Sequence, residues 1–520
     1  MELMERMAYY GVRLVVPVYL VLSTSDGGPG LTHSEKGMIL AGWAATQSWL
    51  PTFSGGLSDR YGYKRTLAAA VVLKATGYLI MAEAQGFWPM VLGTQVLAAG
   101  TGIFKPGIQG TMAHGIARSG NMSMGWGLFY QSVNFGAFLG AYVPAYTRHF
   151  YGWPATFYGC SALVAANAIP LFFYDDPVDE RQTTTDHRSL FTLIKESVQE
   201  LFTSPLLLGF VFVSAGFWFT FHQFFDMLPN YVDDWTNSSG LRTSVGTTLG
   251  WSDWVSRGQA GENIPQEQLL NLNSFLIMTT MFVVAWLSSR VHVLTSTAIG
   301  WAMATGVLAV LVYSPSVTTL LFAIVVFTVG EMMSSPKKQE FMAMLAPPGK
   351  RALYLGYANM PDGIGWVLGG LAAGNAYETK GDKVNLTRQF LKQHADGTDV
   401  SAWLSTADAL GDDAKQEVVK HLGVANFDAA KSALSSADVV SRWADALPRG
   451  DVIEVAIASV PTLPNGAVNS ADALRQYLFA TYNPGQVWWI FVGVGLVSAL
   501  MMVAYSVWAR KTLDARPAAE

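Results

Sequence analysis

Long apolar stretches alternate with short charged joints along most of this chain of 520 residues. Residues 320–327 and 487–507 are clear examples of such stretches. A helix needs about 20 predominantly apolar residues to cross a bilayer, because lipid offers its backbone no hydrogen-bond partners. The pattern therefore predicts twelve membrane-crossing helices, near residues 1–22, 36–56, 64–84, 88–113, 123–147, 152–174, 204–229, 271–289, 293–313, 315–345, 351–375 and 485–508.

A polar joint between the sixth and seventh predicted crossings divides the chain into two halves. This joint is rich in Asp, Arg and Thr. Two six-helix repeats are typical of membrane transporters. We therefore predict an all-α membrane protein, with an N-terminal six-helix bundle at 1–174, a cytoplasmic linker at 175–203 and a C-terminal six-helix bundle at 204–375 and 485–510.

The positions of Lys and Arg indicate which side of the membrane each joint faces. Cytoplasmic loops carry an excess of both residues. With the N-terminus in the cytoplasm, most of them fall in inner joints, namely Arg60, Lys64, Arg65, Arg118, Arg181, Arg188, Lys195, Arg290, Lys337, Lys338, Lys350, Arg351, Arg510, Lys511 and Arg516. We therefore expect both termini to be cytoplasmic.

Two polar insertions interrupt the C-terminal half, at 233–268 and 378–483. Each follows an odd-numbered crossing, so both are expected on the extracytoplasmic side. The longer insertion contains helix-like runs at 413–422 and 427–443. Each run is too short to be stable alone, so we expect them to pack together as a small helical cap. The sequence favours a solvated decoration without a readable function.

Composition supports a membrane protein and argues against other classes. Only 14% of the residues are charged, where a soluble protein carries roughly 25%. A single cysteine, Cys160, excludes an intrachain disulfide framework. His394 and His421 lack ligand-like neighbours, and no nucleophile stands at a suitable spacing from a base, so neither a metal site nor an enzyme is expected. Scattered Lys and Arg make nucleic-acid binding implausible.

The first predicted helix carries a stripe of charged and polar residues. Glu2, Glu5, Arg6, Tyr9 and Arg13 fall within an arc of about 100° on a helix. Charges at membrane depth must face a wet cavity or one another. Protonation of a glutamate would release its arginine partner, which is a way to couple proton entry to helix movement. The alternative is a static cluster of ion pairs.

Several motifs occur in order along the chain. They are Glu2-x-x-Glu5-Arg6 with Tyr9-Tyr10-Gly11-x-Arg13; Gly55-x-Leu57-x-Asp59-Arg60-x-Gly62-x-Lys64-Arg65; Gly100-Thr-Gly-Ile-Phe-Lys105-Pro106; Phe129-Tyr130-x-x-Val-Asn134-x-Gly136; and Gly330-Glu331-x-x-x-Ser335-Pro336. As a set they resemble the proton-dependent oligopeptide transporter family of the major facilitator superfamily. The likeness covers nearly everything except the two insertions.

This resemblance implies a twelve-helix major facilitator fold and a specific activity. Members are proton-coupled symporters that import di- and tripeptides by alternating access. The implied driving force is the proton gradient, without a cofactor, and the implied substrate is a small peptide or peptide-like solute. The implied location is the cell (inner) membrane, as a multi-pass monomer in the lipid bilayer.

The resemblance also assigns roles to individual residues. For proton coupling it implies Glu2, Glu5, Arg6, His222 and Glu331. For substrate binding it implies Tyr9, Tyr10, Arg13, Lys105, Asn134, Trp218, Glu331 and Ser335, and for gating it implies Gly55, Asp59, Arg60, Gly62, Lys64 and Arg65. Arg13 and Lys105 in one half and Glu331 in the other would match the charged ends of a zwitterionic peptide. The alternatives are a snorkelling Lys105 and plain helix packing for Tyr10 and Asn134.

The seventh predicted helix departs from the family. Members usually carry Trp-x-x-x-Glu/Asp-Gln there, whereas this chain has Trp218, His222 and Gln223 at the matching positions. A histidine cannot neutralise Lys105, but it titrates near physiological pH and could carry the coupled proton. We expect Asp226, one turn further on, to supply the missing negative charge. The alternative is a packing histidine.

Other functions stay open at this point. The same fold could move another small solute, such as nitrate or an amino-acid derivative, since an acid-poor site suits an anion. A non-transporting receptor or scaffold is less consistent with a charged interior, because buried charges are costly. Glu2 directly follows Met1, so either the coding start lies upstream or Glu2 lies at a frayed end and contributes less than Glu5.

Overall fold

The fold comes from a computed structural model, which describes residues 1–119, 122–175, 199, 201–249, 263–346, 354, 357–393, 410–433 and 443–514. These residues form helices, with one isolated antiparallel bridge between Thr462 and Val468 and no strand among them. The predicted all-α class is therefore confirmed. Most of the predicted linker lies outside the described residues.

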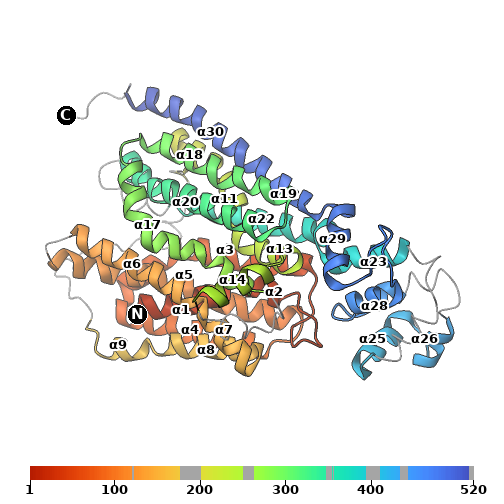
Figure 1. The fold of residues 1–520 in the computed structure, drawn as a ribbon. Coiled ribbons are helices and arrows are strands. Elements are labelled where there is room, and N and C mark those ends of the chain that lie inside the picture. Colours follow the sequence, from red (N-terminus) through yellow and green to blue (C-terminus); the bar gives the residue numbers. More distant parts are fainter. Residues whose placement is uncertain are drawn as a thin grey trace.

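Helices lie over each predicted crossing of the N-terminal half (Figure 1). Three crossings are made of two consecutive helices. The helices are α1 (Glu2–Arg13), α2 (Val16–Tyr19), α3 (His33–Tyr61), α4 (Tyr63–Glu83), α5 (Phe87–Ser119), α6 (Met122–Gly140), α7 (Tyr142–Tyr151), α8 (Trp153–Ala165) and α9 (Ala168–Phe172).

The C-terminal half follows the same pattern, and its last predicted crossing comes after the longer insertion. Its helices are α11 (Pro205–Phe221), α12 (Gln223–Asp226), α13 (Leu228–Trp235), α14 (Ser239–Leu249), α16 (Gln266–Leu270), α17 (Leu272–Ser288), α18 (Val293–Gly306), η2 (Val307–Ala309), α19 (Val310–Tyr313), α20 (Val317–Leu345), α22 (Met360–Lys380), η4 (Pro484–Val487) and α30 (Trp488–Asp514).

The longer insertion forms short helices that pack together. They are α23 (Lys383–Gln393), α25 (Asp412–Leu422), α26 (Phe427–Ala433), α28 (Val452–Ser459) and α29 (Ala471–Tyr482). Phe390, Val418 and Trp443 are buried among them. α25 matches the predicted run at 413–422, whereas α26 covers only the first part of 427–443, and the residues up to 442 lie outside the described ones.

The longer insertion lies at one end of the molecule (Figure 1). Helix α1 starts, and α30 finishes, at the end away from the insertion. We call the other end, which carries α23–α29, the insertion end. α22 continues past its predicted end at 375 as far as Lys380, so it projects into the insertion.

Each half of the molecule has its own hydrophobic core. One core is built from the N-terminal half and includes Trp43 and Phe157, both 0% exposed. The other is built mostly from the C-terminal half and the insertion, and includes Phe217 and Phe327. Helices α3 and α22 then pack along each other between the halves, as do α6 and α17.

The contact between α3 and α22 is close enough to require glycine. A Cβ added at Gly37 would lie 2.7 Å from the backbone oxygen of Gly370 and 3.0 Å from the Cα of Gly374. Small residues allow helix backbones to approach closely in membranes. The two halves are therefore in backbone contact near the insertion end.

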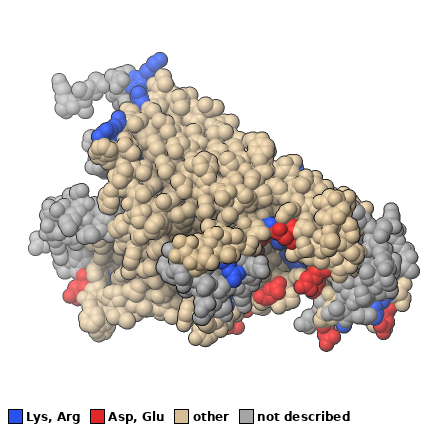
Figure 2. Space-filling model, in the orientation of Figure 1, with Lys and Arg blue, Asp and Glu red and all other residues tan. Residues whose placement is uncertain are grey.

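The outer wall of the molecule is apolar. Eight helical stretches among the described residues are long and apolar enough to cross a membrane, by length and composition. Large side chains such as Phe172, Phe282 and Leu500 are more than 70% exposed. Figure 2 shows a broad uncharged band across the middle of the face, with charged side chains mostly toward the ends. This surface suits contact with lipid tails.

Candidate functional site

Glu2, Glu5 and Arg6, at the start of the charged stripe of α1, pair within the N-terminal half. Arg6 Nε lies 2.9 Å from Glu2 Oε1 and 2.6 Å from Glu5 Oε2. Glu5 also forms an ion pair with Lys74 of α4, and both side chains are fully buried. Lys74 Nζ further donates to Thr101 Oγ1 at 2.8 Å. The sequence interpretation missed Lys74, although a lysine inside the apolar stretch 64–84 was the signal.

The two tyrosines of α1 extend this cluster. Tyr9 is 7% exposed, and its hydroxyl accepts a hydrogen bond of 3.0 Å from Gln47 Nε2 of α3. The Arg6 guanidinium lies 5.3 Å from the centre of the Tyr9 ring. Tyr10 packs edge-on against Tyr9, with ring centres 5.3 Å apart. A mixed-sign cluster of this kind links α1, α3 and α4 through protonatable groups.

Arg13 joins the two halves of the molecule. It forms a buried ion pair with Asp226 of α12, and Arg13 Nη1 donates to the Phe225 backbone oxygen at 3.3 Å. Trp366 Nε1 of α22 donates to Asp226 Oδ2 at 2.8 Å. Asp226 is therefore the ionic partner of Arg13. The expectation that it supplies the charge missing beside His222 is wrong.

A different acid meets His222. Nε2 of His222 lies 2.6 Å from Oδ1 of Asp362, in the first turn of α22. The His222 ring also stacks on Trp366, with centres 4.4 Å apart and planes at 9°. The sequence interpretation missed Asp362, whose only signal was an acid within an otherwise apolar crossing. A histidine and a carboxylate thus replace the single acid of the family pattern.

Two lysines on different helices influence the carboxylate of this histidine–carboxylate pair. Lys105 of α5 and Lys338 of α20 both interact electrostatically with Asp362. Nζ of Lys338 lies 4.1 Å from the centre of the Trp218 ring. The sequence assigned Lys338 to an inner joint, but it lies within α20 and is only 8% exposed. One carboxylate is therefore influenced by positive charge from both halves.

Glu331 lies on α20 and has a polar partner from α17. Asn273 Nδ2 donates to Glu331 Oε2 at 2.9 Å and to Thr328 Oγ1 at 3.0 Å. Ser335 follows one turn later on the same helix and is half-buried. Asn134 of α6 is 9% exposed. A joint role of Arg13, Lys105 and Glu331 around one solute stays a prediction.

The predicted gating motif lies at the turn between α3 and α4. Gly62 joins the two helices with φ +88°, a backbone conformation that residues with a side chain rarely adopt. Nζ of Lys64 donates to the Phe172 backbone oxygen at 3.3 Å, and Arg65 is exposed on α4. Gly55, Asp59 and Arg60 lie on α3, but their side chains are outside the described ones.

Polar side chains of the two halves contact each other at the insertion end. Besides Arg13 and Asp226, Arg148 Nη2 of α7 lies 2.9 Å from Glu267 Oε1 of α16. Nζ of Lys36 donates to Asn230 Oδ1 at 2.7 Å. Nε2 of His33 on α3 also lies 3.6 Å from Oδ1 of Asp382, across the boundary between the halves. The structure is therefore closed there.

Comparisons with known proteins agree with this architecture. Residues 3–370 match the family described as Major Facilitator Superfamily. The chain belongs to the Major Facilitator Superfamily. This match covers more than half of the chain, and its limits run from α1 into α22. The longer insertion lies beyond it.

One curated relative matches most of this member of the superfamily. Peptide transporter YePEPT of Yersinia enterocolitica is 24% identical over 455 residues, which cover 74% of this chain and 87% of the relative. The relatives it resembles are transporters rather than enzymes. The resemblance to peptide transporters is thus confirmed.

Solved structures share the fold. A mutant of peptide transporter POT in complex with sulfate matches with a TM-score of 0.60 and 18% identity, covering 73% of this chain and 88% of that one. A mutant of the nucleoside transporter NupG matches with a TM-score of 0.62 and 12% identity, covering 97% of both chains. At such identities the structural likeness supports the fold alone.

Proposed function

We propose that this protein is a proton-coupled symporter that imports di- and tripeptides or peptide-like solutes across the cell (inner) membrane by alternating access. Both termini would face the cytoplasm and both insertions the outside. It would work as a monomer without a cofactor, driven by the proton gradient. The relative named as a peptide transporter and the paired charges of the interior support this proposal.

The observation that carries the proposal is the electrostatic interaction of unlike charges from both halves. Lys105 comes from the N-terminal half, whereas Lys338 and Asp362 come from the C-terminal half, and both lysines interact electrostatically with the carboxylate. A peptide carboxylate can replace Asp362 as the partner of these lysines. Glu331 offers an acceptor for the peptide amino group. Charge-assisted hydrogen bonds at the two ends tolerate varied side chains between them.

His222 would bind the coupled proton when a peptide carboxylate replaces Asp362 as the partner of the lysines. When a peptide carboxylate binds the two lysines in place of Asp362, the remaining partner of Asp362 is His222, at 2.6 Å. A proton on His222 then neutralises Asp362, so peptide and proton stabilise each other's binding. Binding free energies coupled in this way are reciprocal. Release of the peptide to the cytoplasm would return Asp362 to the lysines and free the proton.

The Glu5 cluster would link the same event to helix movement. Glu5 is shared between Arg6 and Lys74, so it joins α1 to α4. Protonation of Glu5 removes both attractions and frees α1 to shift relative to α4. Because a charge left unpaired at membrane depth is costly, such a shift requires new partners or water.

Uptake into proteoliposomes tests the proposal. Purified protein is reconstituted, and entry of radiolabelled alanyl-alanine is measured with an inward proton gradient, and with the gradient collapsed by a protonophore. We expect accumulation above equilibrium only with the gradient. Equal entry with and without protein would refute peptide transport.

A second candidate is anion or amino-acid-derivative transport by the same fold. The two lysines at Asp362 favour it, because a small anion needs positive partners and no amino-group acceptor. Entry of nitrate and of an amino-acid derivative, measured in the same vesicles as dipeptide entry, separates the two candidates. Nitrate entry without dipeptide entry would favour the anion.

A further inference from the structure

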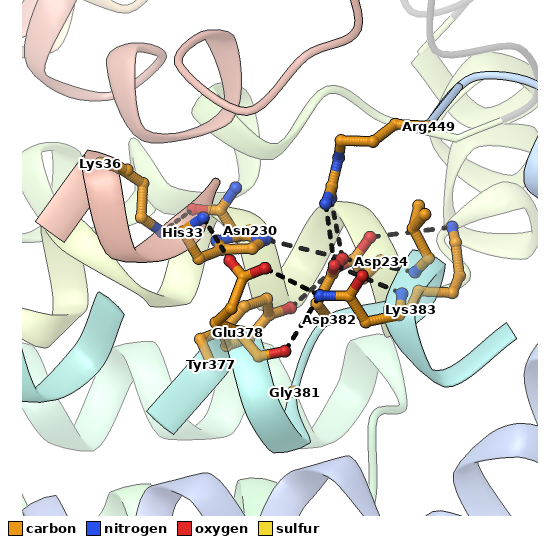
Figure 3. Close-up of polar contacts among 12 residues, drawn as sticks. His33, Lys36, Asn230, Asp234, Tyr377, Glu378, Gly381, Asp382, Lys383 and Arg449 are labelled. Carbon is orange, nitrogen blue, oxygen red and sulfur yellow. Dashed lines mark hydrogen bonds and ion pairs between the residues drawn. The ribbon is translucent and has the colours of Figure 1, made fainter. Parts of the chain in front are cut away.

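The loop at residues 448–451, directly before α28, brings the longer insertion back to the insertion end of the bundle. In this loop, Arg449 binds Asp382 through two hydrogen bonds, Nη1 to Oδ2 at 2.9 Å and Nη2 to Oδ1 at 2.8 Å. Asp382 lies two residues after the end of α22 and is 0% exposed. Figure 3 shows the guanidinium pointing down onto this carboxylate.

Asp382 also faces the other half of the molecule. Nε2 of His33, the first residue of α3, lies 3.6 Å from Asp382 Oδ1. The His33 backbone N–H donates to Glu378 Oε2 at 2.5 Å, and Asn385 Nδ2 holds the other oxygen of Glu378 at 3.0 Å. His33 is 1% exposed. The start of α3 is therefore seated on the carboxylates at the end of α22.

The same loop makes a second, independent contact with the N-terminal half. A Cβ added at Gly450 would lie 3.1 Å from Ser25 Oγ, 3.2 Å from Ser23 Oγ and 3.3 Å from Asp26 Oδ2. These residues form the turn between α2 and α3. The loop 448–451 thus contacts the C-terminal half through Arg449 and the N-terminal half through Gly450.

We propose that the loop 448–451 is a latch by which the insertion holds the insertion end of the transporter closed. Opening this end requires α3 to leave α22, because the two helices are in backbone contact at Gly37 and Gly374. The Ser23–Asp26 turn would leave Gly450 in the same movement. The insertion is then a regulator of alternating access, whatever the solute.

Arg449 acts through the charge of Asp382. In the closed state Asp382 has no access to water, so its charge depends on Arg449. Removal of one partner from a buried ion pair leaves an uncompensated charge, which is strongly unfavourable. Opening would hydrate that charge. Loss of Arg449 therefore shifts the equilibrium toward the open state.

Spin labels on exposed residues of the two halves measure this equilibrium. Tyr151 and Tyr313 are 71% and 73% exposed and lie at the ends of α7 and α19. Both would be replaced by cysteine (Tyr151→Cys, Tyr313→Cys) and labelled, since the single native cysteine, Cys160, is buried. Electron–electron double resonance then gives the populations of short and long distances.

Arg449→Met should raise the open-to-closed ratio about tenfold or more, as expected for a partner specific to one state. Arg449→Met combined with Asp382→Asn should return the ratio toward that of the parent protein, because the buried charge is gone. Lys392→Met is the matched control. Lys392 pairs with Asp445 within the insertion, and both side chains are at least 35% exposed.

An unchanged distance distribution in Arg449→Met would overturn the latch. If that variant does not fold, the open-to-closed ratio of Gly450→Leu in the same labelled protein tests the latch instead. A leucine side chain there would crowd Ser23, Ser25 and Asp26 of the turn, so the open population should rise. An unchanged ratio in Gly450→Leu would overturn the proposal equally. Neither result bears on peptide uptake.

Discussion

His222 Nε2 lies 2.6 Å from Asp362 Oδ1, and this contact joins residues 140 positions apart in the sequence. The Trp366 ring stacks on the histidine, and Lys105 and Lys338 interact electrostatically with the carboxylate. A titratable pair therefore takes the place that the family gives to one acid. The first prediction concerns this pair.

Asp362→Asn should reduce proton-driven dipeptide uptake at least tenfold while leaving counterflow exchange of dipeptide largely intact. The reason is that exchange needs the binding site but not a net proton movement. His222→Gln should have the same signature. The initial rates of proton-driven uptake and of counterflow exchange are measured in proteoliposomes.

The exchanged pair His222→Asp with Asp362→His is the control for this prediction. It keeps one acid and one imidazole in contact, so it should recover more driven uptake than either single variant. Full driven uptake in Asp362→Asn would contradict the role given to the pair.

The ion pair between Arg13 and Asp226 predicts a stability effect. Asp226→Asn leaves the Arg13 guanidinium buried without a charged partner, since both side chains are at most 3% exposed. Such a change typically costs about 3–5 kcal/mol. We expect a clear fall in the thermal unfolding midpoint in detergent. The double variant Arg13→Met with Asp226→Leu should unfold at a temperature closer to the parent, and equal midpoints for all three proteins would refute the pairing.

Glu331→Gln tests the predicted acceptor for the peptide amino group. The glutamine can still accept from Asn273, so the packing of α20 against α17 should persist. Loss of the negative charge should raise the KM for alanyl-alanine about tenfold or more, because a hydrogen bond to a charged group is worth about 1.5–3 kcal/mol. Glu340→Gln on the same helix is the control, since Glu340 is exposed and pairs with Lys337. Equal KM values for the two variants would contradict the assignment.

Acid should favour opening of the insertion end through His33. Burial lowers the pKa of His33 to about 3, with the Lys36 ammonium and the Arg449 guanidinium acting in the same direction and Asp382 against them. Tyr377 and Glu378 of α22 also contact this residue. A hydrated histidine titrates near 6.5. Between these values the open state binds more protons than the closed state, so lowering the pH favours the open state.

The expected size of the pH effect follows from the difference between the pKa values of His33 in the closed and open states. From pH 7.5 to pH 5.5 the open-to-closed ratio should rise about tenfold, because the open-state histidine becomes charged and the closed-state one does not. Asp382 adds nothing in this window, since Arg449 holds the pKa of its carboxyl well below the usual range although burial opposes this. The Tyr151 and Tyr313 spin labels give the ratio. His33→Gln should remove the pH response, and a response that persists in that variant would rule out His33 as its source.

The sequence predicted the helices well because their signal is local. An apolar stretch must be helical in lipid whatever its neighbours, so α4 and α20 could be placed within a few residues. The stripe on α1 was likewise visible, since periodicity puts Glu2, Glu5 and Arg6 on one side.

Partners on other helices could not be read in the same way. Asp226 and Asp362 are both acids near His222 in principle, but only the crossing of α12 and α22 decides that Asp226 meets Arg13 and Asp362 meets His222. Lys338 follows Pro336 and Lys337, and so resembled an inner joint until its burial within α20 was known. Contacts between the loop 448–451 and the α2–α3 turn have no sequence signal.

The central claim is that opposite charges from the two halves bind one peptide together with a proton. Simultaneous measurement of dipeptide entry and internal acidification, in the same proteoliposomes, tests it most directly. The account predicts that alanyl-alanine added outside, without an imposed gradient, acidifies the vesicle interior in a fixed ratio to its entry, and that Asp362→Asn abolishes the acidification. Dipeptide entry without acidification, or acidification driven by nitrate but not by dipeptide, would contradict it.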